Sequence, residues 1–198
     1  MAEWDDWAAG WDDNPAVRIY ADKAFAALTA RQSVDGLRVL DFGCGTGTLT
    51  EKLADRAAHV VAVDLSPKMI ARLTAKGLSR VTAVTADLTA ATAPEPAGLG
   101  APFDLITASS VCAFLPDYAA ALGRMRRLLA PGAIFVQWDW ELAPGDAGTG
   151  FSKPAVEQAL REAGFNAIEV TTAFSMTMDD ADTPVLMAIA RNNARDGR

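Results

Sequence analysis

Five short apolar runs dominate this sequence, and each one is typical of a buried strand. The runs are 37–42 (LRVLDF), 59–64 (HVVAVD), 80–86 (RVTAVTA), 103–108 (FDLITA) and 133–138 (AIFVQW). Segments with helical spacing separate most of them, and strands that alternate with helices predict a mainly parallel α/β sheet with helices on both faces. Two last runs, 167–176 and 184–190, have only a polar connection (MDDADT) between them, which favours an antiparallel addition to that sheet.

Capping residues and prolines mark where the helices begin. Asn14 precedes Pro15 and Ser66 precedes Pro67, and proline suits the first helical position after a capping residue. The expected helices are 14–30, about 48–57, 66–76, 116–130 and 152–163. Residues 89–102 are rich in Ala, Pro and Gly and therefore predict a loop.

The length and composition fit one enzyme-sized domain. The 198 residues are 51% hydrophobic and 22% charged, so the chain can bury a sizeable core. We expect one domain over 14–191, a separate N-terminal segment over 1–13 and a frayed tail over 192–198.

The charge and the cysteine count exclude several classes of partner. The net charge is −7 without a Lys/Arg cluster, which argues against nucleic acid and against a membrane surface. Two cysteines form neither a disulfide framework nor a metal-ligand set, so we expect no metal and a cytoplasmic location. The chain is expected to act on a small molecule as a monomer or a homodimer.

Polar groups follow the first three apolar runs, at the edge of the sheet where ligands bind in such folds. After the first run comes DFGCGTGT (41–48), in which Asp41 precedes three closely spaced glycines. Glycines let the main chain turn tightly and approach a ligand, and the next helix offers free N–H groups to a carboxylate. Asp64 ends the second run and can hold both hydroxyls of a ribose, while Asp87 follows the third and can accept from an exocyclic amine. Ammonium, carboxylate, ribose diol and adenine amine are the polar parts of S-adenosylmethionine (SAM).

Four stretches resemble the class I SAM-dependent methyltransferases, in particular small bacterial enzymes related to the quinone-biosynthesis methyltransferases. They are VLDFGCGTG (39–47), VVAVDLSPKMI (60–70), TADL (85–88) and FDLITASSVCAFLPD (103–117). The resemblance implies a Rossmann-like seven-stranded sheet in the order 3-2-1-4-5-7-6, with strand 7 antiparallel. It also implies that SAM is bound and that S-adenosylhomocysteine (SAH) is released.

Carried over by position, the resemblance assigns roles to the residues around the cofactor. The residues expected to contact SAM are Asp41, Gly43, Cys44, Gly45, Gly47, Asp64, Leu65, Met69, Asp87, Leu88 and Ser109. Leu65 and Leu88 would sandwich the adenine, although plain core packing is an equal alternative for both. Cys44 is expected to contribute a small side chain rather than a thiolate.

The acceptor side of the site is less defined. Its expected walls are Trp7, Phe114, Leu115, Trp138 and Trp140, which suit a small apolar or aromatic metabolite, although Trp138 also fits the core. The only histidine, His59, begins a strand at the wrong end of the sheet for catalysis. Asp139 and Glu141 are the only nearby carboxylates that could act as a base, and a solvated loop is the alternative for both.

Two other functions are compatible with a glycine turn followed by an acidic residue. A nicotinamide-dependent oxidoreductase would need glycine at position 48 in its G-x-G-x-x-G fingerprint, where this chain has Thr48. A non-catalytic SAM-binding regulator would keep the same glycines and acids. Titration with SAM and with NADH distinguishes a methyltransferase from the oxidoreductase. Release of SAH in the presence of an acceptor distinguishes it from the non-catalytic regulator.

The start of the chain is acidic and rich in tryptophan. Five acidic residues precede the first basic residue, Arg18, and three of the five tryptophans lie in the same stretch. Helical spacing puts Trp4, Trp7 and Trp11 on one stripe. In the resembled family, N-terminal helices often lie over the cofactor. We therefore expect a lid with inward tryptophans and with acids facing water, in which Trp11 and Tyr20 lie nearest SAM; a helix docked on its own domain or on a second subunit is the alternative.

Overall fold

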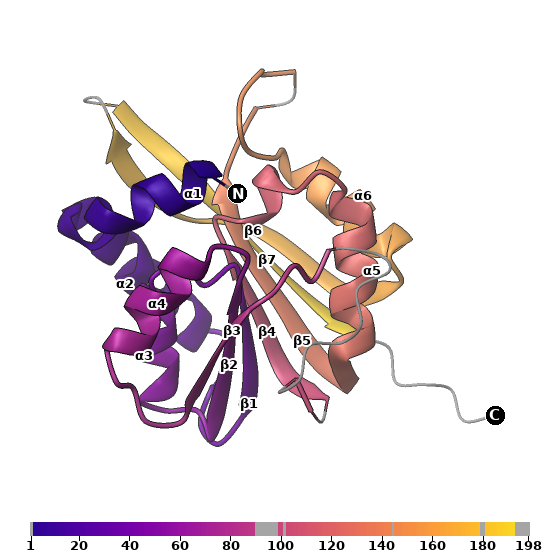
Figure 1. Ribbon diagram of the computed structural model, residues 1–198. Coiled ribbons are helices and arrows are strands. Elements are labelled where there is room, and N and C mark those ends of the chain that lie inside the picture. Colours follow the sequence, from indigo (N-terminus) through magenta and orange to yellow (C-terminus); the bar gives the residue numbers. More distant parts are fainter. Residues whose placement is uncertain (1, 90–98, 101, 144, 179–180, 193–198) are drawn as a thin grey trace. The chain divides into compact units, whose positions relative to one another are not determined.

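A computed structural model describes residues 2–89, 99–100, 102–143, 145–178 and 181–192 (Figure 1). The chain divides into two compact units, Met1–Ala101 and Pro102–Arg198. Seven strands form one sheet in the order β3-β2-β1-β4-β5-β7-β6. β7 pairs antiparallel with both β5 and β6, so the predicted fold class and strand order are confirmed.

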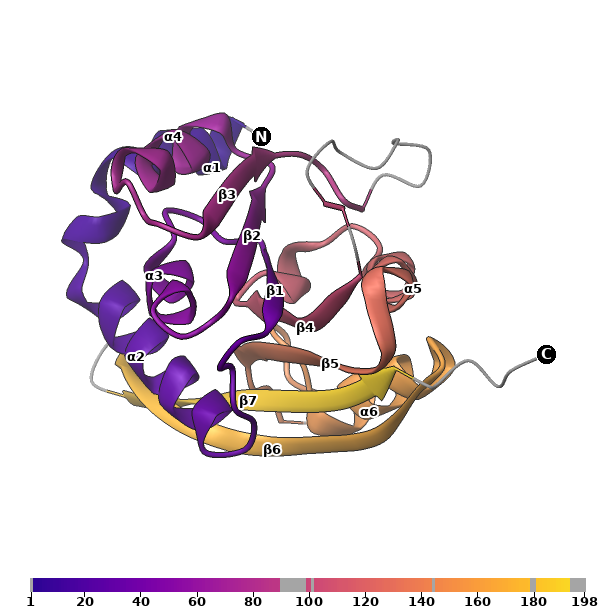
Figure 2. The ribbon, with the colours of Figure 1, turned by 90° about the horizontal axis from the view of Figure 1, so that it is seen from below.

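The described residues of the first unit form three parallel strands and four α-helices, of which the last two pack on the strands and the first two pack on those helices. Its strands are β1 (Arg38–Phe42), β2 (His59–Asp64) and β3 (Val81–Thr85), and its helices are α1 (Ala2–Trp7), α2 (Pro15–Thr29), α3 (Thr48–Ala54) and α4 (Pro67–Ala75). Figures 1 and 2 show these helices gathered on one side of the three strands, with α1 lying over α4. Asn14 caps α2 and Ser66 caps α4 through their side-chain oxygens, as the sequence predicts.

The second unit holds the other four strands and two α-helices. Its elements are β4 (Phe103–Ser109), the 3-10 helix η2 (Cys112–Phe114), α5 (Tyr118–Leu128), β5 (Leu129–Trp140), α6 (Lys153–Glu162), β6 (Phe165–Met178) and β7 (Ala181–Asn192). α5 packs on β5, and α6 packs on β6 and β7. Trp138 and Phe135 lie at the centre of this unit with almost no exposed surface.

Several strands are longer than predicted. β5 begins at Leu129, before the Pro131-Gly132 pair that we expected to separate helix from strand. Its pairing with β4 shifts between Phe103 and Leu105, so the extra residues lie in an irregular stretch rather than ending the strand. β6 and β7 also extend toward each other beyond the predicted ends, because Thr177 pairs with Asp182 inside the stretch that we expected to be a loop.

The N-terminal segment is not one continuous α-helix. α1 ends at Trp7, and a 3-10 helix, η1 (Ala8–Asp13), follows it. The expectation of inward tryptophans is wrong for Trp7, whose side chain is 49% exposed. The expectation of water-facing acids is wrong for Asp5 and Asp12, which accept hydrogen bonds from the body of the unit.

The predicted loop and the predicted C-terminal tail lie only partly within the described residues. Most of the predicted loop 89–102, and the tail beyond Asn192, lie outside the described residues. Within the described part of the chain, no helix is long and apolar enough to span a membrane. The described side chains also contain no group of three or more potential metal ligands.

Candidate functional site

Three glycines of the turn between β1 and α3 adopt a left-handed backbone conformation that favours glycine. Gly43, Gly45 and Gly47 all have positive φ angles, of 69°, 55° and 86°. A Cβ atom at Gly47 would lie 2.3 Å from Leu73 Cδ1, so packing as well as backbone conformation excludes a side chain there. The N–H of Gly43 donates to the carbonyl of Val63 at 2.8 Å, which fixes the turn to the end of β2.

Asp64 at the end of β2 lies beside this turn. Its Oδ2 accepts the backbone N–H of Gly45 and its Oδ1 accepts that of Ser66, each at 2.8 Å. Burial raises the pKa of Asp64 above its ordinary value, although the backbone hydrogen bonds act in the opposite direction. A carboxylate has about four acceptor positions, so Asp64 keeps acceptor capacity beyond these backbone bonds. We expect a ribose hydroxyl of SAM to use it.

Asp41 lies one strand away and is almost completely buried. The hydroxyl of Thr50, on α3, donates to Asp41 Oδ2 at 2.6 Å. This bond connects the end of β1 to the helix that follows the glycines. Asp41 therefore stabilises the glycine turn by joining β1 to α3. We also expect Asp41 to accept a hydrogen bond from the ammonium group of SAM.

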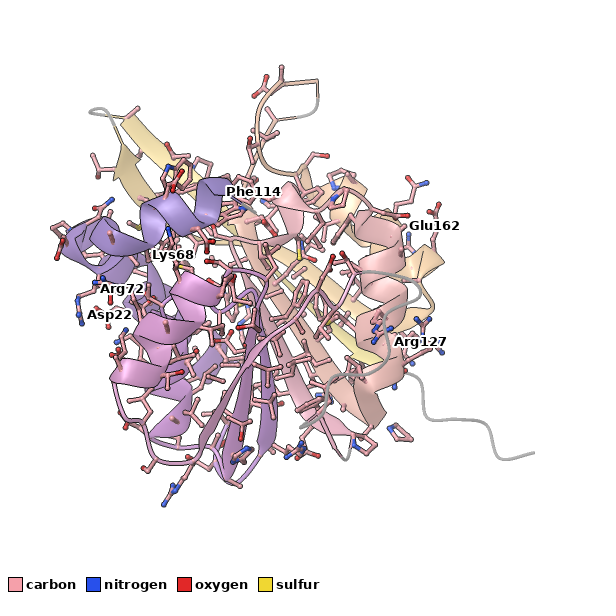
Figure 3. All side chains as sticks on the ribbon, in the orientation of Figure 1. Asp22, Lys68, Arg72, Phe114, Arg127 and Glu162 are labelled. Atoms are coloured by element: carbon pink, nitrogen blue, oxygen red, sulfur yellow. The ribbon has the colours of Figure 1, made fainter. Side chains whose placement is uncertain are left out.

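The N-terminal segment is attached to the glycine turn and to the start of α4. Thr46, inside the turn, donates its hydroxyl to Asp12 Oδ1 at 2.5 Å, and Asp12 also faces Lys76 Nζ at 3.5 Å. The hydroxyl of Ser66 donates to Asp5 Oδ1 at 2.5 Å. Figure 3 labels Lys68 beneath α1, in agreement with the hydrogen bond of its backbone N–H to the same Asp5 oxygen.

The tryptophans of this segment form a cluster next to the turn. Trp7 and Trp11 are nearly parallel, at an interplanar angle of 14° with ring centroids 6.3 Å apart, and Trp4 contacts both edge-on. Trp11 Nε1 lies 3.8 Å from the position that a Cβ atom would take at Gly45. Trp11 is thus in contact with the turn that we expect to hold the methionine part of SAM.

The other predicted cofactor contacts in this unit have mixed environments. Leu65 is partly exposed, whereas Leu88 and Met69 are buried. The burial of Leu88 agrees with the alternative that this side chain packs in the core. Asp87 is exposed and accepts from both the backbone N–H and the hydroxyl of Thr89. Burial raises the pKa of the Cys44 thiol well above its ordinary value, in agreement with a small uncharged side chain. The partly buried Tyr20 lies on α2.

In the second unit, a chain of hydrogen bonds connects three buried or partly buried polar residues. Tyr118 donates its hydroxyl to Gln137 Oε1 at 2.5 Å, and Gln137 Nε2 donates to Asp139 Oδ2 at 3.0 Å. Asp139 Oδ1 accepts the backbone N–H of Ala113, so β5 is joined to η2. Asp139 is 1% exposed, and burial raises its pKa to about 8. The solvated-loop alternative is therefore excluded for Asp139.

The remaining predicted residues of this unit serve different structural roles. Glu141 is paired with Lys153 at 3.1 Å and accepts the hydroxyl of Thr172, which holds the residue after β5 in place. Trp138 is fully buried, so it belongs to the core of the unit, while Trp140 is half-buried. Phe114 is 46% exposed beside the half-buried Leu115, and Ser109 ends β4.

Four polar residues at these sites were missed in the sequence. Thr46 lies inside the glycine turn and Thr50 lies on α3 after it, and Gln137 and Tyr118 extend the network from Asp139. The alternation of Gln137 and Asp139 along an otherwise apolar strand is a signal that could have found the pair, because polar residues two apart on a buried strand share one face.

Comparison with known proteins finds methyltransferases that resemble this chain in sequence and in fold. A methyltransferase domain family matches residues 40–135, which include the glycine turn and Asp64. An N-methyltransferase, NodS of Bradyrhizobium japonicum WM9, solved in complex with SAH, superposes with a TM-score of 0.69 at 25% identity, covering 91% of this chain and 89% of that one. The chain thus has the strand order and the glycine turn of the class I SAM-dependent methyltransferases, and residues 40–135 match their methyltransferase domain.

Two curated relatives have different named acceptors. A ubiquinone biosynthesis O-methyltransferase of Xylella fastidiosa (strain M23) is 39% identical over 117 residues, which are 55% of this chain and 44% of the relative. A trans-aconitate 2-methyltransferase of Azoarcus sp. (strain BH72) is 39% identical over 129 residues, which are 63% of this chain and 48% of the relative. The chain thus spans about half the length of the curated relatives it matches.

Proposed function

We propose that this protein transfers the methyl group of SAM to a small organic acceptor with an apolar or aromatic part. The observation that carries the proposal is the Asp64 carboxylate, which accepts hydrogen bonds from the backbone of Gly45 and Ser66 beside a turn with three left-handed glycines. In this arrangement Asp64, which we expect to bind the ribose, lies next to the backbone of the glycine turn, which a ligand can approach closely. When bound, SAM supplies an activated methyl carbon: the acceptor's lone pair forms the new bond, the carbon–sulfur bond breaks with its electron pair on sulfur, and the acceptor's proton leaves to a base or to water.

The chain's own contribution is mainly to position the two reactants. Gly43, Gly45 and Gly47 leave room for the methionine part, and the first turn of α3 offers backbone N–H groups to its carboxylate. Asp64 holds the ribose hydroxyls. Because the methyl donor is already activated, fixing its orientation toward the acceptor can supply a large part of the rate.

We further propose that the N-terminal segment, residues 1–13, is a lid over the cofactor. The support is its attachment to the glycine turn through Asp12 and Thr46, and the contact of Trp11 with Gly45. A bound cofactor next to Gly45 would meet the Trp11 indole. The lid would shield the reacting groups from water.

The two curated relatives are named for different acceptors, so the chemical class of the acceptor is inferred from the side chains of this chain. The exposed large hydrophobic side chains among the described residues are Trp7, Ile19 and Phe114, and two of these three are predicted acceptor walls. In each unit, an exposed aromatic side chain at a predicted acceptor wall favours an acceptor with an apolar or planar part.

Isothermal titration tests the cofactor first. We expect SAH to bind with a single site and NADH to give no binding, whereas binding of NADH alone would overturn the proposal in favour of an oxidoreductase. The Asp64→Asn variant should weaken SAH binding at least about tenfold, since charge-assisted hydrogen bonds contribute roughly 1.5–3 kcal/mol. Asp55→Asn makes the same charge change at an exposed helix end and should bind SAH normally.

Turnover then separates an enzyme from a binding protein. We expect SAH to be released from SAM when a pool of small metabolites is added, and not in its absence. A protein that binds SAH but releases none with any pool would be a SAM-binding regulator instead.

A further inference from the structure

A surface pocket lies between the N-terminal segment and the start of α2. Its volume is about 400 Å³, within the range of small-molecule sites. The pocket is lined by Asp6, Trp7, Gly10, Trp11, Asn14 and Val17. Because Trp11 also contacts Gly45, one indole is shared between this pocket and the glycine turn.

The chemistry of the lining is selective. Two nearly parallel indoles 6.3 Å apart offer adjacent π faces, and Trp4 supports both of them edge-on. A cation lying over an accessible face of Trp7 or Trp11, within about 6 Å of the ring centroid, is attracted by that face through a cation–π interaction. Among the described residues, the lining contains one carboxylate, Asp6, and no lysine or arginine.

The acids of the segment divide into two groups. Asp5 and Asp12 are used in hydrogen bonds to Ser66 and Thr46, so they attach the segment to the unit. Asp6 is exposed on the pocket, and the segment has no basic residue of its own before Arg18. The negative charge near the indoles is therefore available to a ligand.

We propose that this pocket binds an organic ammonium group, carried by the methyl acceptor. The two indoles contact the alkyl groups around the nitrogen, and Asp6 balances its charge. The assignment to the acceptor rests on the proposed methyltransferase function, whereas the preference of the pocket for a cation depends only on its own residues.

Choline and its uncharged isostere 3,3-dimethylbutan-1-ol form a matched pair of probes for this proposal. The five tryptophans give five indole N–H signals in a ¹H–¹⁵N spectrum, and the Trp7→Leu variant assigns one of them. At constant ionic strength, choline should shift the Trp7 and Trp11 signals saturably, and the neutral isostere should bind at least about threefold more weakly. Equal affinity for the two probes, or no saturable shift with choline, would overturn the proposal.

A charge-matched pair of variants locates the site. Asp6→Asn should lower choline affinity about two- to fivefold, in keeping with an exposed ion pair. Asp13→Asn removes the same charge from an exposed position that does not line the pocket, so it should leave the affinity within twofold. Equal losses in both variants would show a diffuse charge effect and contradict the proposed site.

SAH titration of the same samples keeps the two proposals apart. If SAH binds and choline does not, the cation pocket is wrong and the methyltransferase proposal stands. If choline binds selectively and SAH does not, the pocket is a cation site and the proposed function is wrong.

Discussion

The hydroxyl of Thr46 donates to the carboxylate of Asp12 across 34 positions of the chain, at 2.5 Å. Thr46 lies inside the glycine turn, and Asp12 lies near the end of the N-terminal segment. The bond therefore joins this segment directly to the loop that we expect to hold the cofactor. Lys76 faces the same carboxylate and is itself paired with Glu51 on α3 at 2.6 Å.

Deletion of residues 1–13 should weaken SAH binding by about tenfold while the rest of the unit remains folded. The loss of three hydrogen bonds, from Thr46, Ser66 and the backbone of Lys68, predicts a decrease of about 2–4 kcal/mol in the free energy of unfolding. Isothermal titration with SAH and urea unfolding followed by circular dichroism give the two quantities. Asp12→Asn should change both in the same direction by a smaller amount. A truncated protein that binds SAH as well as the full chain does would refute the lid.

Replacing Gly47 by alanine should be strongly destabilising. The new Cβ would overlap Leu73 Cδ1 at 2.3 Å and the residue would have to keep a φ of 86°, so we expect a loss of about 2–4 kcal/mol in urea unfolding. Gly36→Ala is the matched control, because Gly36 has a φ of 71° but nothing within 4 Å of the added atom. It should lose about 1 kcal/mol, from backbone strain alone.

The overlap at position 47 can be tested separately from the strain. In the Gly47→Ala background, Leu73→Ala should cost less than it does in the wild-type protein, because it removes the atom that the new methyl group meets. Additive effects of the two substitutions would show that strain alone explains the loss.

Asp139 predicts a specific dependence of stability on pH. Burial raises its pKa to about 8 in the folded state, from about 3.9 in the unfolded chain. The folded state therefore holds the proton more tightly, and this stabilisation is fully present below about pH 4 and is lost as the pH rises toward 8.

Urea unfolding of wild type and Asp139→Asn between pH 4 and pH 9 measures this contribution. The wild-type protein should lose up to about 1.4 kcal/mol per pH unit relative to the variant across that window, and the difference should level off above pH 8. Asp146→Asn, at an exposed loop position, should follow the wild-type curve. A difference between wild type and Asp139→Asn that does not change with pH would contradict the buried protonated carboxyl.

The two cysteine thiols should be unreactive in the native protein. Burial raises the pKa of both Cys44 and Cys112 well above its ordinary value, and Asp139 adds to the effect at Cys112. A thiol-reactive disulfide reagent at pH 8 should therefore modify neither thiol before unfolding and both in urea. Rapid native modification of Cys112 would indicate that the region around η2 opens.

The sheet and the cofactor side of the site could be predicted because each depends on local patterns. The second strand, 59–64, was predicted with its observed ends, since a short apolar run between polar residues defines both limits. The glycines and Asp64 were found because the end of a strand fixes where a side chain must lie. Leu88 was left open between adenine and core, and its complete burial follows from packing that the sequence does not encode locally.

The errors come from contacts between distant parts of the chain. Helical spacing grouped the three tryptophans, which do form a cluster. We then expected the acidic residues on the opposite face of the helix to be in contact with water. Asp5 instead accepts a hydrogen bond from Ser66, 61 positions later, and this partner has no signature near Asp5. The early start of β5 has a similar origin, because Leu129 pairs with Phe103 of a neighbouring strand and this pairing outweighs the local preference of Pro131-Gly132 for a turn.

The attachment of Asp5 to Ser66 also has a consequence for the order of events during synthesis. The ribosome makes Asp5 long before Ser66, so the start of the chain has no partner until α4 has emerged and formed its capped first turn. The N-terminal segment must therefore find its place after the elements beneath it, as a late step of maturation. A segment that docks last onto an already formed surface can also detach first, and the nascent chain would thus leave the glycine turn open until the segment closes on it.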